Sequence, residues 1–181
     1  MSHKQTKPTR LWFLARGFKQ ADPCHTGGKI VWLHPENNDV LSAYGTKLTL
    51  TKVPYEKYHK NATQYLKMPR GYGDMYLARL KYLTFVGPIP KGCVIDHIDG
   101  NSLNNSPRNL RAIPRPINDR DGGFLRKLRN HGINVADYEI SFILEGYERL
   151  ALWKAGHSHN KYSLLERDAL LRIFLGKEDV Q

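Results

Sequence analysis

The sequence is short of cysteine, of acidic residues and of long apolar stretches, and each shortage excludes a class of protein. Its 181 residues include two cysteines, Cys24 and Cys93, too few for a disulfide framework or a four-thiolate zinc site. No run approaches 18 consecutive apolar residues, which argues against a membrane span. The opening MSHKQTKPTR is polar and basic with no apolar region behind it, which argues against a signal peptide. We therefore expect a reduced, cytoplasmic setting without a membrane.

The positive charge is unevenly spread along the chain. There are 28 Lys and Arg against 17 Asp and Glu, a formal net charge of +11. Residues 1–90 carry +9, residues 91–130 carry +4, and residues 131–181 carry −2. This distribution favours a nucleic-acid surface on the first two thirds of the chain, although net charge also serves solubility.

Hydrophobic periodicity divides the chain into a β-rich start and a helical end. Short aromatic and β-branched runs between turn residues predict strands within residues 11–53, and residues 54–73 are interpreted as an irregular basic connector. A helix is expected over 75–87, strands over 93–100 and 109–113, and a helix from Pro114 or Arg115. Apolar residues at steps of three and four predict helices over 140–155 and after Ser163.

The residues that carry chemistry cluster around His97. Asp96 and His97 are adjacent on an expected strand, so their side chains alternate unless the strand end twists or opens. A histidine titrating near neutrality can deprotonate water, and a carboxylate is a suitable hard ligand for magnesium. Asparagine oxygens can add a neutral metal ligand or fix an imidazole tautomer. In a basic protein this combination suggests phosphodiester cleavage, as one option among several.

The run GPIPKGCVIDHIDGNSLNNSPRNLRAI closely resembles the signature of HNH endonucleases, the His-Me finger or ββα-metal nucleases, especially phage and homing types. Such members have Asp-His closing a first strand, Asn-Leu opening a second, and Asn or His on the following helix. The resemblance covers about residues 70–122.

The resemblance implies a role for each matching position. His97 corresponds to the general base, Asp96 and Asn118 to the metal ligands, and Asn109 to the residue whose hydrogen bond holds the imidazole. The implied cofactor is a single Mg²⁺, with Mn²⁺ able to substitute. The implied products have 5′-phosphate and 3′-hydroxyl ends. Pro114 and Pro116 must fit within the first helical turn for Asn118 to be placed correctly.

Several neighbouring residues have simpler interpretations. Asp99-Gly100-Asn101 is interpreted as turn chemistry, and Asn104 and Asn105 as amides that brace the loop. Basic side chains flanking the motif are expected to grip the DNA backbone: Arg79, Lys81, Arg108, Arg111, Arg115 and Arg120.

We therefore expect an α+β protein with three regions. Residues 1–73 form a basic, mostly β DNA-binding region, residues 74–122 a ββα-metal nuclease core, and residues 123–181 a helical region able to form a dimer. The expected function is metal-dependent cleavage of double-stranded DNA by a phage-like or homing-type endonuclease. The alternatives are a restriction or host-defence nuclease and a DNA-binding accessory protein that has lost activity.

Overall fold

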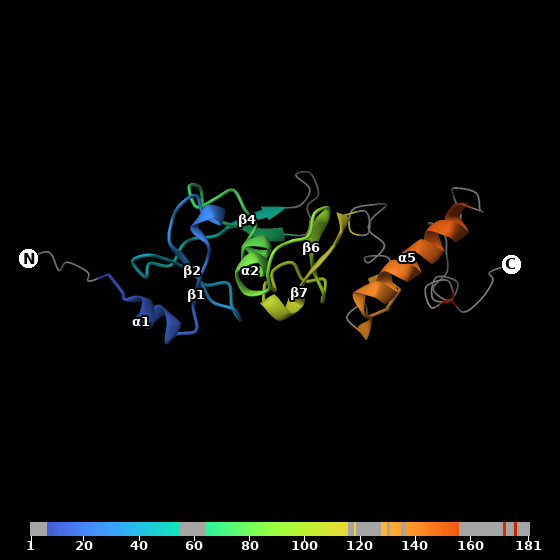
Figure 1. Cartoon of the computed structure of the whole chain (residues 1–181), viewed down its shortest axis with the longest axis horizontal. Helices are drawn as coiled ribbons and strands as arrows, with labels where there is room; N and C mark the ends of the chain where they lie inside the picture. The colour runs from blue at the N-terminus through green and yellow to red at the C-terminus, as the bar shows by residue number, and fades with distance from the viewer. Residues whose placement is uncertain are drawn as a thin grey trace, which may run out of the picture. The chain divides into compact units, whose positions relative to one another are not determined.

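The computed structural model has mixed α+β architecture and describes residues 7–54, 64–115, 118, 128–129, 131–134, 137–155, 172 and 176 (Figure 1). It divides into two compact units, the first within residues 1–91 and 95–112 and the second within 92–94 and 113–181. This division cuts through the expected nuclease core, so the three-region organisation stays a prediction. No helix in the described part of the chain is long and apolar enough to cross a bilayer.

The elements are short. The helices, including the 3₁₀ helices η1 and η2, are α1 (Arg10–Leu14), η1 (Pro23–His25), α2 (Leu77–Phe85), η2 (Pro107–Asn109) and α5 (Ile140–Ala155). The strands are β1 (Lys19–Gln20), β2 (Val31–Leu33), β3 (Val40–Ser42), β4 (Thr51–Pro54), β5 (Gln64–Lys67), β6 (Cys93–His97) and β7 (Leu110–Pro114).

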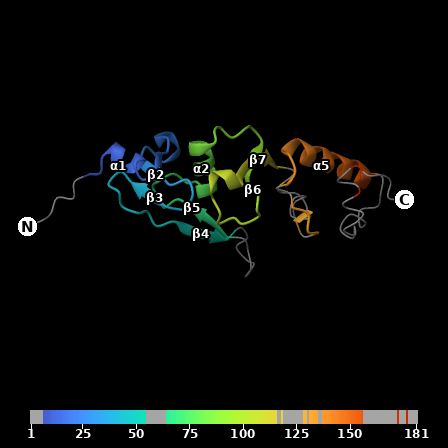
Figure 2. The same ribbon diagram turned by 90° about the horizontal axis from the view of Figure 1, so that it is seen from below.

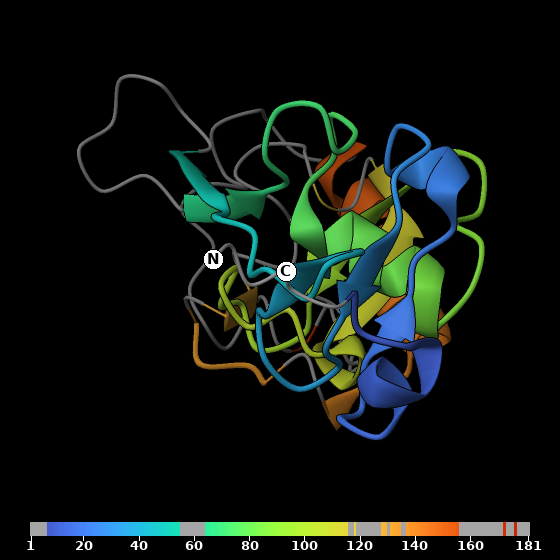
Figure 3. The same cartoon turned by 90° about the vertical axis from the view of Figure 1, so that its left-hand side faces the viewer.

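In the antiparallel sheet β1-β2-β3, every residue of β2 and β3 is buried, whereas β1 is not. Val31 and Leu33 of β2 pack into a core shared with Leu77 and Leu80 of α2. Trp32, which points to the opposite face, stacks on Phe13 of α1 with ring centroids 4.4 Å apart. In Figure 3 the blue strands lie in front of the green helix α2. Both aromatic rings are therefore part of the core.

The strand expected at the start of residues 11–53 is the helix α1 instead. Thr9 caps α1 by accepting a hydrogen bond from the Trp12 backbone N–H onto its hydroxyl oxygen, at 3.2 Å. The aromatic and leucine residues of this segment suit a strand by propensity, but the cap satisfies an N–H that a helix start leaves unpaired. The helix turns Phe13 inward and leaves Leu11 exposed.

Part of the expected irregular connector is a strand. β5 pairs antiparallel with β4, with Thr51 opposite Lys67 and Val53 opposite Tyr65 (Figure 2). Residues 64–67 are mostly polar, but Leu66 enters the main core and its neighbours stay outside. The buried Leu66 and the backbone pairing with β4 are sufficient to form this strand, because a strand with one buried face needs apolar residues only at alternate positions.

The strand–strand–helix order expected around the motif is present. β6 and β7 form a two-stranded sheet whose ends are joined by Ile98 N–H to Asn109 O at 2.9 Å and Arg115 N–H to Gly92 O at 3.0 Å. Arg115 and Asn118 are helical. In Figures 1 and 2 α2 lies between β2 and the strands β6 and β7.

The helices expected on both sides of the motif have different outcomes. α2 lies within residues 75–87 and α5 spans 140–155, which confirms both predictions. Ile143 and Leu150 are buried on α5. The helix expected after Ser163 lies outside the described residues except at Arg172, which is helical.

Lys81 is the fully buried charged residue of α2. Its ammonium donates hydrogen bonds to the backbone oxygens of Pro35 and Asn37, each at 2.8 Å. Burial lowers the pKa of Lys81 to about 8, and the negative charges of Glu36 and Asp39 oppose this shift. Lys81 therefore ties α2 to the turn between β2 and β3.

The buried amine predicts a specific dependence of stability on pH. Because the folded-state pKa is about 8 against 10.5 in the unfolded chain, the unfolded chain binds more protons between these values, and stability rises with pH across that window. The stability advantage of the parent over Lys81→Met should therefore grow by roughly 1–2 kcal/mol between pH 7.5 and 9.5 in urea unfolding. Arg79→Met on the same helix removes a side chain that does not titrate there and should show no such change. An advantage independent of pH would contradict the assignment.

Candidate active site

Asp96 and His97 end β6 and are both almost completely buried, at 6% and 5% exposed. Successive strand residues point to opposite sides, so the two side chains meet different partners. Asp96 faces Arg111 of β7, whereas His97 faces the loop that connects the two strands. The hairpin formed by β6 and β7 thus holds a carboxylate and an imidazole on consecutive residues, each with its own hydrogen-bond partner.

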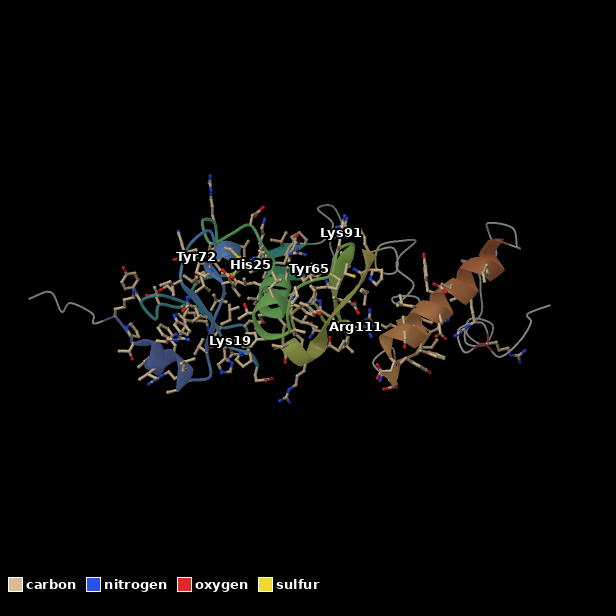
Figure 4. All side chains as sticks on the ribbon, in the orientation of Figure 1. Lys19, His25, Tyr65, Tyr72, Lys91 and Arg111 are labelled. Carbon is tan, nitrogen blue, oxygen red and sulfur yellow. The ribbon has the colours of Figure 1, made fainter. Side chains whose placement is uncertain are left out.

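The carboxylate of Asp96 forms an ion pair with Arg111. The Nε of Arg111 donates to Oδ2 of Asp96 at 3.0 Å, and the Arg111 side chain is 14% exposed. The Nη2 atom of Arg111 is buried and has no hydrogen-bond partner among the residues that the structure describes. Figure 4 labels Arg111 on β7. Arg111 was predicted to bind the DNA backbone. In the structure its side chain is already paired with Asp96, the expected metal ligand.

His97 is held by Asn105, not by Asn109. The Nε2 atom of His97 lies 3.1 Å from Oδ1 of Asn105, whose side chain is 2% exposed. The Nδ2 atom of Asn105 donates to Asn38 Oδ1 at 3.1 Å and to Leu103 O at 3.2 Å, so Oδ1 is the atom that faces the ring. An amide oxygen only accepts, so Nε2 carries the proton and Nδ1 of the neutral ring carries the lone pair.

An aromatic residue from outside the motif lies beside the imidazole. The ring centroid of Tyr65, labelled in Figure 4, is 6.1 Å from that of His97, and the two planes are tilted by 51°. The next contact along β5 is Gln64 O, which accepts a hydrogen bond from the Ser102 hydroxyl at 2.5 Å. Strand β5 therefore packs against the motif loop.

Asn109 braces the turn that follows His97. Its Nδ2 donates to Asp99 Oδ1 at 2.9 Å and to Asn104 O at 2.8 Å, and its Oδ1 accepts from the Asp99 N–H at 3.0 Å. The prediction that Asn109 holds the imidazole is wrong, because these bonds direct its amide to the turn. The turn interpretation of Asp99 and the bracing role of Asn104 are confirmed.

The turn also changes the acidity of Asp99. Partial burial by itself would raise the pKa of Asp99, but hydrogen bonds from Asn104, from the Asn101 N–H and from Asn109 lower it, and the nearby His97 lowers it further. The carboxylate of Asp99 is therefore the favoured form in the folded turn.

The remaining predicted site residues are scattered. Arg79, Arg108 and Arg115 are exposed, Asn118 is half-buried on its helix, and Arg120 lies outside the described residues. Lys81 does not fit a DNA contact, because its ammonium is fully buried and bonded to two backbone oxygens. Asn118 belongs to the second compact unit, and Asp96 and His97 to the first.

The motif region matches a known family. Residues 76–120 match the family model described as HNH endonuclease. This segment therefore carries the HNH endonuclease signature. The match includes α2, the β6–β7 hairpin and Asn118. The resemblance seen in the sequence is thereby confirmed.

The relatives of this HNH segment are phage and prophage proteins. "Protein 3.8" of Escherichia phage T7 is 46% identical over 57 residues, which are 31% of this chain and 42% of that protein. YosQ of Bacillus subtilis (strain 168), SPbeta prophage-derived and described by its name as a homing endonuclease of the HNH type, is 41% identical over 49 residues, 27% of this chain and 28% of YosQ. The chain thus spans less than half the length of these relatives.

Among solved structures, the chain has a partial match to that of the HNH homing endonuclease I-HmuI, which is described for its DNA binding and cleavage. It aligns over 61% of this chain and 56% of that chain with a TM-score of 0.38 and 23% sequence identity.

The sequence pointed to Asp96 and His97 but missed the residues that surround them. Asn105 was interpreted as a loop brace, since nothing in the pair Asn104-Asn105 tells which amide turns inward. Asn38 and Tyr65 come from segments with no motif of their own. Only the chain's folding brings them to the HNH loop, so no local pattern could have found them.

The turn bonds predict how an added carboxylate should behave. Asn109→Asp places a second carboxylate against Asp99, which should destabilise the fold by about 1–2 kcal/mol at pH 7.5. Repulsion raises the folded pKa of one carboxylate above its unfolded value, so the loss should shrink as the pH falls toward 5. Asn109→Ala loses the same bonds without a new charge, and its loss should stay constant over this range. Equal pH profiles of urea unfolding for the two variants would contradict the proposed contact.

Proposed function

We propose that this chain is a metal-dependent DNA endonuclease that hydrolyses phosphodiester bonds with His97 as the general base. The observation that supports it most is the hydrogen bond from His97 Nε2 to Asn105, beside Asp96 and within the HNH segment. This bond puts the basic lone pair on Nδ1, the form of a neutral imidazole that accepts a proton from water. His97 would take that proton as the water attacks the phosphorus in line, while the bond from phosphorus to the 3′ oxygen breaks and that oxygen leaves to take a proton from solvent.

Access to the base requires a local change. His97 is 5% exposed and Asp96 is 6% exposed, so neither a water nor a scissile phosphate reaches them without movement of the surrounding chain. We infer that DNA binding accompanies such an opening. The hydrogen bonds of the Asp99 turn and of Asn105 would hold the imidazole in position meanwhile.

The donor set fits a hard divalent cation. Asp96 and Asn118 would offer a carboxylate and an amide oxygen, ligands suited to Mg²⁺ or Mn²⁺ with water in the remaining positions. No group of three or more His, Cys, Asp and Glu side chains in the described ranges could hold a metal, which disfavours a zinc-type site there. When bound, the cation would stabilise the negative charge that develops on the phosphate. Arg111 already compensates the charge of Asp96 from the opposite strand.

The DNA would be held by exposed basic side chains of the matched segment 76–120. Arg79, Arg108 and Arg115 are exposed, and Arg120 is a further candidate by its sequence position. The basic region 1–73 would extend this phosphate-binding surface, because residues 1–90 carry a net +9. The names of the phage and prophage relatives favour a phage or homing setting over a restriction or defence role.

The base assignment predicts a large loss of cleavage. His97→Ala should nick supercoiled plasmid roughly a hundredfold more slowly than the parent while DNA affinity stays nearly unchanged, because the imidazole acts on water and not on the backbone. His25→Ala, in the 3₁₀ helix η1 and outside the matched segment 76–120, is the matched histidine control and should cleave like the parent. Parental nicking by His97→Ala would refute the assignment. A parent protein that binds DNA without nicking it would favour the accessory-protein alternative.

Metal dependence is tested by chelation. EDTA should stop nicking, and excess Mg²⁺ or Mn²⁺ should restore it, because the proposed ligands are hard oxygen donors. The circular dichroism spectrum and the thermal melt should not change with EDTA, since the hairpin is held by backbone bonds and the Asp96–Arg111 pair. Unfolding on chelation would indicate a structural metal and contradict this version of the site.

A further inference from the structure

We propose that Asn38, in the turn between β2 and β3, is a positioning residue that sets the tautomer of His97 by fixing the amide of Asn105. The inference rests on the proposed function, since the tautomer matters for catalysis only where His97 is the base. Asn38 lies outside the matched segment 76–120, so this residue completes the site from another part of the chain.

A chain of hydrogen bonds, in which every donor points the same way along the chain, links His97, Asn105 and Asn38. Asn38 Nδ2 donates to Leu103 O at 2.8 Å, which leaves Asn38 Oδ1 as the acceptor for Asn105 Nδ2 at 3.1 Å. Asn105 Oδ1 then accepts from His97 Nε2 at 3.1 Å. The backbone oxygen of Leu103 can only accept, so it determines the direction of every bond that follows.

Asn38 matters because an asparagine amide is nearly symmetric in shape. Rotation of the Asn105 amide by about 180° would exchange Oδ1 and Nδ2 and present an N–H donor to His97. The imidazole would then have to accept at Nε2 and carry its proton on Nδ1, the atom needed as the base. Two acceptors oppose this rotation, Asn38 Oδ1 and Leu103 O, and the bond to Asn38 is the shorter of the two. Since Asn105 is 2% exposed, water does not readily replace a lost acceptor.

The turn that carries Asn38 is anchored independently of this chain of bonds. Lys81 Nζ donates to Pro35 O and Asn37 O, which flank Glu36 and precede Asn38 directly. The Ser106 hydroxyl donates to Glu36 Oε2 at 3.3 Å, next to Asn105 along the chain. α2 and the motif loop therefore both hold the turn in the place from which Asn38 reaches Asn105.

The experiment compares three variants of the full-length chain: Asn38→Leu, Asn38→Asp and Asn37→Ala. Asn38→Leu removes the acceptor, whereas Asn38→Asp keeps an oxygen facing Asn105 Nδ2. Asn37→Ala is the matched control, because it removes only the bond from the Asp39 N–H to Asn37 Oδ1 and weakens the same turn without touching the chain of bonds. The first readout is ¹⁵N NMR of the His97 ring at about pH 8.5, which reports which ring nitrogen carries the proton. The second is the single-turnover cleavage rate beside the DNA dissociation constant.

The parent, Asn38→Asp and Asn37→Ala should all show the proton on Nε2. Asn38→Leu should show a mixture of tautomers, and its single-turnover rate should fall about tenfold with unchanged DNA affinity. An unchanged tautomer in Asn38→Leu, or an equal change in Asn37→Ala, would overturn the proposal. If Asn38→Leu is soluble but unfolded, Asn38→Asp decides the question. Loss of the proton from Nε2 of His97 in that variant would also overturn the proposal.

The two proposals fail in different ways. If the tautomer responds as expected in a protein that does not cleave DNA, the positioning role stands and the proposed function fails. If the protein cleaves DNA through His97 and the tautomer ignores Asn38, the function stands and the positioning role fails.

Discussion

The buried amide of Asn105 has one orientation that satisfies all its hydrogen bonds, and the geometry around His97 depends on it. A buried donor or acceptor left unpaired costs more than a typical hydrogen bond contributes, so a dry site tolerates few arrangements of its amides. Here the Leu103 carbonyl fixes Asn38, Asn38 helps to fix Asn105, and Asn105 fixes the ring. A chain of weak individual contacts thus produces a defined tautomer.

The hydrophobic packing places the polar parts where they meet. α2 buries Leu77 and Leu80 against the sheet β1-β2-β3, and the same helix carries Lys81 toward the turn at the end of β2. Burying an ammonium is costly, as the lowered pKa of Lys81 reflects, and two backbone oxygens offset part of that cost. The apolar residues therefore set the distance between helix and sheet, and the lysine fixes which turn residues face the motif.

Local signals predicted the motif and its strands, but tertiary contacts decided the rest. The order Asp96-His97, turn, Asn109-Leu110 is evident in the sequence because strand propensity and the Asp-Gly-Asn turn act between neighbours. α1 was misassigned because Thr9 as a cap outweighed the strand propensity of Trp12 and Phe13. Lys81 looked like a surface cation because nothing in a single sequence shows that its helix face is covered. The exchange of roles between Asn105 and Asn109 has the same origin, since both are amides and only the path of the loop decides which one reaches the ring.

The charges at the β6–β7 hairpin give a physical reason for the proposed metal dependence. Asp96 is neutralised by Arg111, and Asp99 is stabilised as a carboxylate by its turn. An approaching phosphodiester would add a negative charge beside these two, and burial around Asp96 weakens solvent screening there. A guanidinium already paired with Asp96 offsets little of that new charge, because its own charge is compensated. A divalent ion bound by Asp96 would carry surplus positive charge to the phosphate, whereas the paired arginine alone would not. By the same argument, the main role of Arg111 is structural. It balances the charge of the buried carboxylate of Asp96 at the end of β6, and it holds that carboxylate in place as a candidate metal ligand.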